Sequence, residues 1–358
     1  MLLNTNLRLL DGKLGELQAT PYFEKDLQGF VDQLREVAQV TLDRLVDQEP
    51  EVADTLARSI WKATQFLSGS NTNLIPYEVV HCLKVALRDW TDGGYLITTD
   101  ITADRNFYFH GVPDHFWTWA KTYADVEFKH KLVQIQMPEL YRHRPLFNLV
   151  LYHELGHFID TTRNISKLAL LYLESDGHVL PSLSSCPSNW SDIEFEAAKV
   201  FHAREYFADV FAACYLGDSI REFLGQFVPN DPTEVTHPAT YDRLQVISAL
   251  LNSQDNNLIK MINLALSGLG LPELALRYTA PDLESTFGNV RPYDVRNVEE
   301  LHGMFEAGWH FLGEASLQKS PPWNAVRIGE VERIINDLME KSIRNFMIQE
   351  RWQRAATD

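Results

Sequence analysis

The motif His-Glu-Leu-Gly-His at residues 153–157 combines two imidazoles and a carboxylate at a spacing that suits metal chemistry. On a helix, His153 and His157 lie about 40° apart around the axis and one turn apart along it. Two imidazoles placed in this way can bind one zinc ion. Glu154 lies beside them without being needed as a ligand, and its carboxylate can accept a proton from a water molecule that the metal activates.

A third protein ligand is expected on a later helix, in the run Glu-Tyr-Phe-Ala-Asp at residues 205–209. Glu205 and Asp209 are one turn apart on one face of this helix. The small residues Ala208 and Ala212 let two helices approach closely enough to share a metal. We expect Glu205 to ligate zinc and Asp209 to accept the outer N–H of a ligand histidine, which fixes the tautomer of that histidine.

Two further residues could provide the third ligand. His202 and Asp209 itself lie near the same helix face and are alternative third ligands, ranked behind Glu205. The metzincin pattern continues with Gly and then His after the motif. It is excluded because Asp160 and Arg163 occupy those positions.

The order of these motifs resembles that of the gluzincin metallopeptidases, over residues 146–251. With Thr236-His237-Pro238 and Arg243 downstream, the pattern is similar to the prenyl-protease and stress-protease branch of that group. That branch is usually embedded in membranes, whereas the longest apolar stretches here, such as residues 168–173, fall far short of the ~20 residues that a span needs. The chain therefore resembles a soluble relative, or a regulatory protease of the kind that cleaves repressors in bacteria.

The resemblance also implies roles for residues beyond the ligands. A peptidase needs a donor that stabilises the oxyanion formed during hydrolysis, and His237 is the implied candidate. Tyr241 and Tyr206 are alternatives for this role. Arg243 is expected to pair with a carboxylate near the site.

Hydrophobic periodicity indicates which elements position these residues. Up to about residue 90, apolar residues recur three and four apart, as on helices, and Asp92-Gly93-Gly94 ends the pattern. Strands are expected at residues 95–99, 106–109 and 132–137, with a helical piece near 115–123. Helix returns over residues 146–216, interrupted by a loop at 178–189, and a further helix starts around Pro238. The last ~90 residues are expected to be helical, with Asn297 and Glu300 resembling a capping box and a final helix at 324–352.

The sequence thus predicts an α+β fold that is predominantly helical, with a small sheet ahead of the motif helix. We expect an N-terminal helical region at residues 1–94, a zincin-like catalytic domain at 95–255 and a C-terminal helical region at 256–358. In zincin folds the strand before the motif helix is the sheet edge, to which an extended substrate adds by main-chain hydrogen bonds. Residues 131–137 take this place, and an ordinary core strand is the alternative.

Composition narrows the classes of partner. The chain carries 32 Lys and Arg against 49 Asp and Glu, a net charge of −17, which disfavours nucleic acid and anionic lipid as partners. Three cysteines cannot all pair and show no metal-type spacing, which is typical of a reduced, cytoplasmic protein. The N-terminal segment has no uninterrupted apolar core, so no secretory signal is expected there.

The leading hypothesis is a zinc-dependent endopeptidase with one Zn²⁺ per chain, which cleaves an intracellular protein or peptide and is restrained by a regulatory partner. The alternative is a zincin-fold sensor or binding module whose zinc is structural. An intact Glu154 argues against this alternative, because a structural site does not need that carboxylate. A helical scaffold with a chance motif is disfavoured by the paired Glu205 and Asp209.

Overall fold

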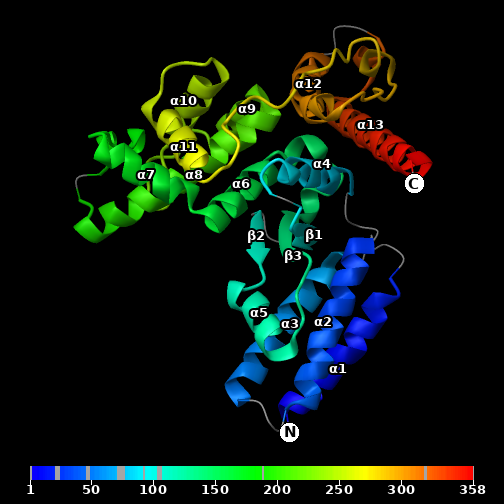
Figure 1. Ribbon diagram of the computed structural model, residues 1–358. Coiled ribbons are helices and arrows are strands. Elements are labelled where there is room, and N and C mark those ends of the chain that lie inside the picture. The colour runs from blue at the N-terminus through cyan, green and yellow to red at the C-terminus, as the bar shows by residue number, and fades with distance from the viewer. Residues whose placement is uncertain are drawn as a thin grey trace. The chain divides into compact units, whose positions relative to one another are not determined.

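The structure, a computed structural model, describes residues 2–20, 25–45, 49–70, 77–91, 93–102, 107–187, 189–317 and 321–357. These residues form mostly α-helix together with one three-stranded sheet (Figure 1). The predicted fold class, a predominantly helical α+β protein, is confirmed at this level. Asp92 and Asn106, which the sequence assigned to a turn and to the start of a strand, lie outside the described residues.

The chain divides into two compact units. Unit 1 comprises residues 1–80 and 91–142, and unit 2 comprises residues 81–90 and 143–358. This division differs from the three regions expected from the sequence. The sheet belongs with the N-terminal helices rather than with the motif helix, and the helices on either side of residue 255 share one unit.

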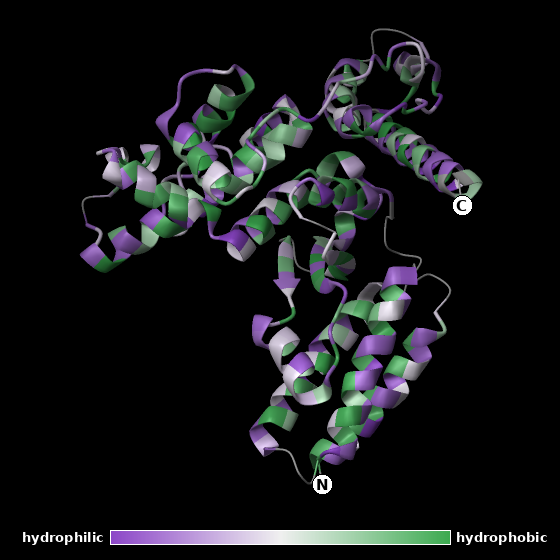
Figure 2. Cartoon of the chain, in the orientation of Figure 1, coloured by the Kyte–Doolittle hydropathy of each residue, from purple (hydrophilic) through white to green (hydrophobic). Residues whose placement is uncertain are grey.

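Unit 1 is built on amphipathic helices whose buried residues recur three and four apart. In α1 (Leu2–Gln18) the buried positions are Leu7, Leu10, Leu14 and Leu17. This helix packs on α2 (Lys25–Asp43) and on α3 (Pro50–Ser70). Figure 2 shows hydrophobic and hydrophilic residues interleaved along α1 and α2, as expected for helices that bury one face. The helical prediction for this part of the chain is confirmed. The next helix along the chain is α4 (Tyr77–Arg88), whose residues from 81 on belong to unit 2.

The sheet of unit 1 has the strand order β1-β3-β2. β1 (Tyr95–Thr102) pairs in parallel with β3 (Lys131–Pro138), and β2 (Tyr108–Gly111) pairs antiparallel with the other side of β3. β3 is therefore the central strand, and the expectation that residues 131–137 form an edge for substrate is wrong. Its main-chain groups are already used by two neighbours, so no extended peptide can add there. Between β2 and β3 lie the predicted helical piece, α5 (Asp114–Trp119), and a π-helical turn, η1 (Ala120–Ala124).

Unit 2 contains the motif helix, α6 (Val150–Arg163), followed by α7 (Ile165–Ser175). α6 ends because Asn164 adopts a left-handed conformation with φ 55°, which asparagine tolerates better than most residues. The predicted loop follows, with only a short 3₁₀ turn, η4 (Pro181–Ser185). The long helix α8 (Asp192–Leu216) then starts with a capping box between Ser191 and Glu194.

α6 and α8 cross at very close range. A Cβ atom added to Gly156 would lie 2.8 Å from Ala208 Cα and 3.2 Å from Phe211 Cβ. Only glycine fits at this point of α6, because any side chain would meet the backbone of α8. Ala208 is one of the small residues expected to permit a close approach, and the structure confirms that expectation.

The remaining helices of unit 2 are α9 (Asp218–Phe227), α10 (Thr240–Leu251), α11 (Asn257–Gly268), α12 (Val298–Ser316) and α13 (Ile328–Thr357). Residues 271–297 are not helical apart from a short 3₁₀ turn, η5 (Phe287–Asn289), so the expectation of helix there is wrong. Pro272, Pro281 and Pro292 explain the difference, since each removes a backbone donor.

The start of α12 follows the expected cap only in part. Asn297 accepts a hydrogen bond from the Glu300 amide, but the Glu300 carboxylate accepts from the Arg296 amide rather than from Asn297.

No helix in the described part of the chain has the length and apolarity that crossing a bilayer requires.

Candidate metal centre

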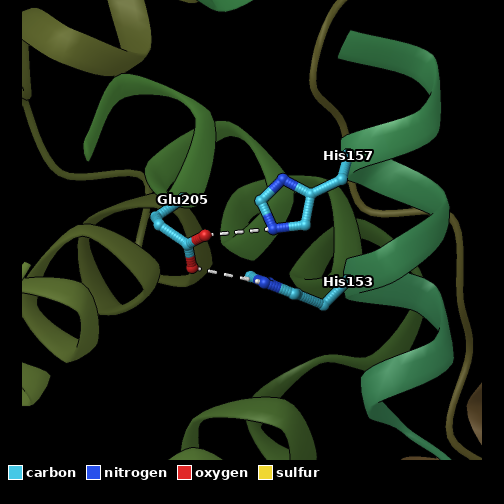
Figure 3. Close-up of side chains that lie close together, drawn as sticks. All are labelled: His153, His157 and Glu205. Carbon is cyan, nitrogen blue, oxygen red and sulfur yellow. Dashed lines mark ion pairs between the residues drawn. The ribbon is translucent and has the colours of Figure 1, made fainter. Parts of the chain in front are cut away.

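Three side chains from α6 and α8 converge in unit 2. His153 and His157 project from one face of α6 toward Glu205 on α8 (Figure 3). Glu205 Oε2 lies 3.4 Å from His153 Nε2, and Glu205 Oε1 lies 3.1 Å from His157 Nε2. One ligand atom from each of the three residues lies within 4.8 Å of the other two. The structure thus brings together the three residues predicted as ligands.

Asp209, one turn after Glu205, lies behind His153. Its Oδ1 lies 3.0 Å from His153 Nδ1, so the nitrogen that faces away from Glu205 is held by a carboxylate. Arg243 on α10 donates to both oxygens of Asp209, from Nε at 2.8 Å and from Nη2 at 2.7 Å. All of these side chains are buried. The fork of Arg243 therefore fixes the Asp209 carboxylate, which in turn fixes the His153 ring.

The charges of the cluster favour a cation. Glu154, Glu205 and Asp209 supply three carboxylates, and Arg243 supplies one guanidinium, so with both imidazoles in the neutral form that ligates a metal the cluster carries two negative charges in excess. Burial alone would lower the pKa of His153, but the nearby carboxylates of Asp209 and Glu205 raise it to about 10, so this ring takes up positive charge as a proton when no metal supplies it. Burial opposes ionisation of Asp209, yet Arg243 and His153 hold its pKa below the ordinary value. A divalent cation would balance the excess charge.

The residues also fit a metal in their geometry. Glu205 Oε2 is buried and forms no hydrogen bond with any described residue; its neighbours His153 Nε2 and Arg243 Nη2 both lie at 3.4 Å. Atoms bound to a tetrahedral zinc ion at about 2.0–2.1 Å lie about 3.3 Å from one another. The carboxylate-to-imidazole separations of 3.4 and 3.1 Å are close to this value. The two oxygens of Glu205 each face one imidazole Nε2, and one of them has no hydrogen-bond donor, which suits a metal ligand.

Glu154 is placed beside this cluster without belonging to it. Its side chain is partly buried, and burial raises the pKa of its carboxyl, against the effect of the His153 and His157 charges. Within the described chain, no hydrogen bond or ion pair ties down this carboxylate. Its oxygens are therefore available to a ligand or a water molecule at the cluster.

The structure also locates the three candidates for an oxyanion donor. His237 lies next to the cluster, with Nε2 3.9 Å from Glu205 Oε1, and its side chain is 56% exposed. Tyr206 is fully buried, its hydroxyl accepts a hydrogen bond from the Ser182 amide at 3.2 Å, and burial raises its pKa. Tyr241 is 69% exposed in the first turn of α10. Of the three, His237 is the residue that the structure brings to the cluster.

His202, an alternative third ligand, is directed elsewhere. The ring is completely buried, its Nδ1 lies 2.8 Å from the Ser182 hydroxyl, and its Nε2 lies 2.7 Å from the Glu234 carbonyl oxygen. Burial lowers the pKa of His202, which favours a neutral ring. Both nitrogens are occupied by groups outside the cluster, so Glu205 is the third ligand that the geometry favours.

Sequence reasoning missed two features of the site. The first is the pair of contacts that His202 makes with Ser182 and with the Glu234 main chain. Both partners lie outside the long helices, in segments whose position depends on distant packing. The second is the close approach of α6 and α8 at Gly156. A glycine inside a helix costs about 0.5–1 kcal/mol relative to alanine, so its presence there was a signal of a close backbone approach.

Comparisons of this chain with protein-family models, with curated proteins and with solved structures found no match. The interpretation of the cluster therefore depends on its own geometry and chemistry.

Proposed function

We propose that the chain is a zinc-dependent endopeptidase of the gluzincin type, with a zincin-like core formed around α6 and α8. The observation that carries this proposal is the convergence of His153, His157 and Glu205 beside an uncommitted carboxylate, Glu154. Catalytic zinc sites have three protein ligands and one open position, and two histidines with one glutamate form such a set. Structural zinc sites, in contrast, are usually closed by four protein ligands.

Bound zinc would supply Lewis-acid chemistry, which polarises a carbonyl and makes water more acidic. Each protein group then has a defined task. Glu154 accepts a proton from the attacking water and passes it to the leaving amine. His237, at the exposed edge of the cluster, donates to the oxygen of the scissile carbonyl as negative charge develops there. Asp209 keeps the His153 proton on Nδ1, so that Nε2 remains available to the metal.

The proposed substrate is a protein or peptide in the cytoplasm. In the part of the chain that the structure describes, Cys82, Cys186 and Cys214 form no disulfide bond, which suits a reducing compartment. We further propose that a regulatory partner restrains the activity, because an unrestrained protease in that compartment would damage its host.

The test compares wild type with Glu154→Gln, in metal content and in cleavage. The amide keeps the shape of the side chain but cannot accept a proton, so zinc should remain at about one per chain while hydrolysis is lost. Zinc is measured by mass spectrometry of purified protein. Cleavage is measured by proteomics of new N-termini in cells that express each variant.

Glu196→Gln on α8 is the matched control, because it makes the same change at an exposed carboxylate whose one ion pair among the described residues is with Lys199. It should retain both zinc and cleavage. If Glu154→Gln produces the same new N-termini as wild type, the peptidase mechanism is wrong. If wild type binds zinc but produces no Glu154-dependent termini, the site belongs to a binding module.

A further inference from the structure

His202 connects three segments of unit 2 through one buried ring. It lies on α8, one turn before Glu205 and Tyr206, and its side chain is inaccessible to solvent. Nδ1 is 2.8 Å from the hydroxyl of Ser182 in η4, and Nε2 is 2.7 Å from the carbonyl oxygen of Glu234 in the loop between α9 and α10. No ligand role is left for this ring, because both of its nitrogens are used.

The partners of His202 fix its tautomer. A backbone carbonyl can only accept, so His202 Nε2 must carry the proton and donate it to Glu234. In a neutral ring Nδ1 then has a lone pair, and the Ser182 hydroxyl donates to it. The bond to Ser182 is buried and the bond to Glu234 is partly buried, so removal of the ring's polar atoms would take away the partner of the Ser182 hydroxyl and the hydrogen bond that His202 donates to the Glu234 carbonyl.

The Glu234 peptide leads directly to His237. The Glu234 amide donates to the His237 carbonyl oxygen at 2.9 Å, which closes the turn that carries the His237 side chain. His237 Nε2 in turn lies 3.9 Å from Glu205 Oε1, back on α8. These contacts therefore connect His202 on α8, through the turn at residues 234–237, to Glu205, which is also on α8.

Other hydrogen bonds hold the two ends of this loop. The Thr240 amide donates to the Asp231 carbonyl oxygen at 3.1 Å, and the Thr240 hydroxyl donates to the Val228 carbonyl oxygen at 2.6 Å. These bonds hold the residues next to α9 and α10. Among the hydrogen bonds of the described residues, the one from His202 Nε2 ties the turn at residues 234–237 to α8.

We propose that His202 is a positioning residue, whose Nε2–H holds the loop at residues 228–239 so that His237 lies beside the metal cluster. The functional meaning of this role rests on the proposed peptidase activity, but the tether itself does not. One imidazole, anchored on the helix that provides Glu205, thereby sets the position of His237 relative to Glu205.

The first test measures amide hydrogen exchange of residues 233–237 in the full chain. Loss of one net hydrogen bond should speed exchange there by about 3- to 10-fold in His202→Phe, which keeps a ring but no donor. His202→Gln places an amide N–H near the Nε2 position, so its exchange should stay within about 2-fold of wild type. Amides of α11, which has no bond to His202, serve as the internal control.

Wild type itself supplies a second readout that no folding defect can disturb. Side-chain ¹H–¹⁵N spectra of histidine-labelled protein should show a neutral His202 with its proton on Nε2. A proton on Nδ1 would overturn the proposal. Equal exchange in wild type and His202→Phe would overturn it too, and so would equal acceleration in the Phe and Gln variants.

Zinc content separates this proposal from the proposed function. On incubation with zinc sulfate, His202→Phe should retain as much zinc as wild type, because His153, His157 and Glu205 keep their places. Loss of zinc in that variant would contradict a role limited to the loop. If wild type itself binds no zinc, the proposed function fails, while the exchange and tautomer results still decide the role of His202.

Discussion

At the scale of single residues, Glu205 and Asp209 differ in what they contact although they are one turn apart. Glu205 directs its oxygens at two imidazole Nε2 atoms, whereas Asp209 holds the far nitrogen of one imidazole and pairs with Arg243. The spacing of His153 and His157 predicted their shared face, because that relation is local to one helix. The choice of Glu205 over His202 was only a ranking, because the contacts that occupy His202 come from loops that periodicity does not locate.

This difference predicts an order of zinc affinities. Glu205→Ala removes an oxygen that would bind the metal, whereas Asp209→Asn removes only the acceptor for His153 Nδ1. Asp209→Asn should weaken zinc binding by about 10- to 100-fold, and Glu205→Ala should weaken it further. Competition with a chelator of known affinity measures both constants.

His202→Gln is the control in this series, and its zinc affinity should remain within about 3-fold of wild type. The assignment of Glu205 as the third ligand is wrong if Asp209→Asn or His202→Gln releases zinc more readily than Glu205→Ala. The third ligand would then have to be a residue other than Glu205.

At the scale of elements, the site depends on the contact between α6 and α8. The sequence predicted both helices and the small residues on α8, because helical periodicity and residue size are visible locally. It did not predict that β3 is the central strand, because the number of neighbours of a strand depends on pairing with distant segments. It also placed helix at residues 271–297, where the prolines prevail over the surrounding helical pattern.

Gly156 provides a test of this contact. In Gly156→Ala the new Cβ would lie 2.8 Å from Ala208 Cα, so α6 and α8 must move apart. Overpacking of this kind destabilises proteins by about 1–3 kcal/mol, and here it should also weaken zinc binding, because the ligands lie on both helices. The free energy of unfolding and the zinc affinity are measured on the same samples.

Gly313→Ala in α12 is the matched control, since nothing lies within 4 Å of its added Cβ and the position is exposed. It should be neutral or stabilise by up to about 1 kcal/mol, the helix preference of alanine over glycine. Gly156→Ala behaving like Gly313→Ala would show that the two helices are not held at the distance the site requires.

At the scale of the whole molecule, unit 2 buries a polar network behind the motif helix. The Tyr152 hydroxyl lies 2.9 Å from His302 Nδ1, and the His302 ring also packs against Tyr215. Burial lowers the pKa of His302 to about 3, with smaller contributions from the charges of His81 and Arg277. Residue spacing did not indicate this network, because its members lie far apart in the sequence, on α6, α8 and α12.

A pH dependence of stability follows from the neutral, buried His302. Its pKa is about 3 in the folded chain and about 6.5 when unfolded, so between these values the unfolded state binds one more proton than the folded state. The contribution of His302 to stability is thus complete above pH 6.5 and is lost as pH falls toward 3, by about 1.4 kcal/mol per pH unit.

The test compares wild type with His302→Phe, which loses the bond to Tyr152 at every pH but has no titrating ring. The free energy of opening is measured from hydrogen exchange of α8 and α12 amides between pH 6 and pH 4. As the pH falls, it should decrease in wild type by about 1.4 kcal/mol per pH unit more than in His302→Phe. Parallel pH profiles for the two proteins would mean that His302 takes up a proton in the folded state, contrary to its burial.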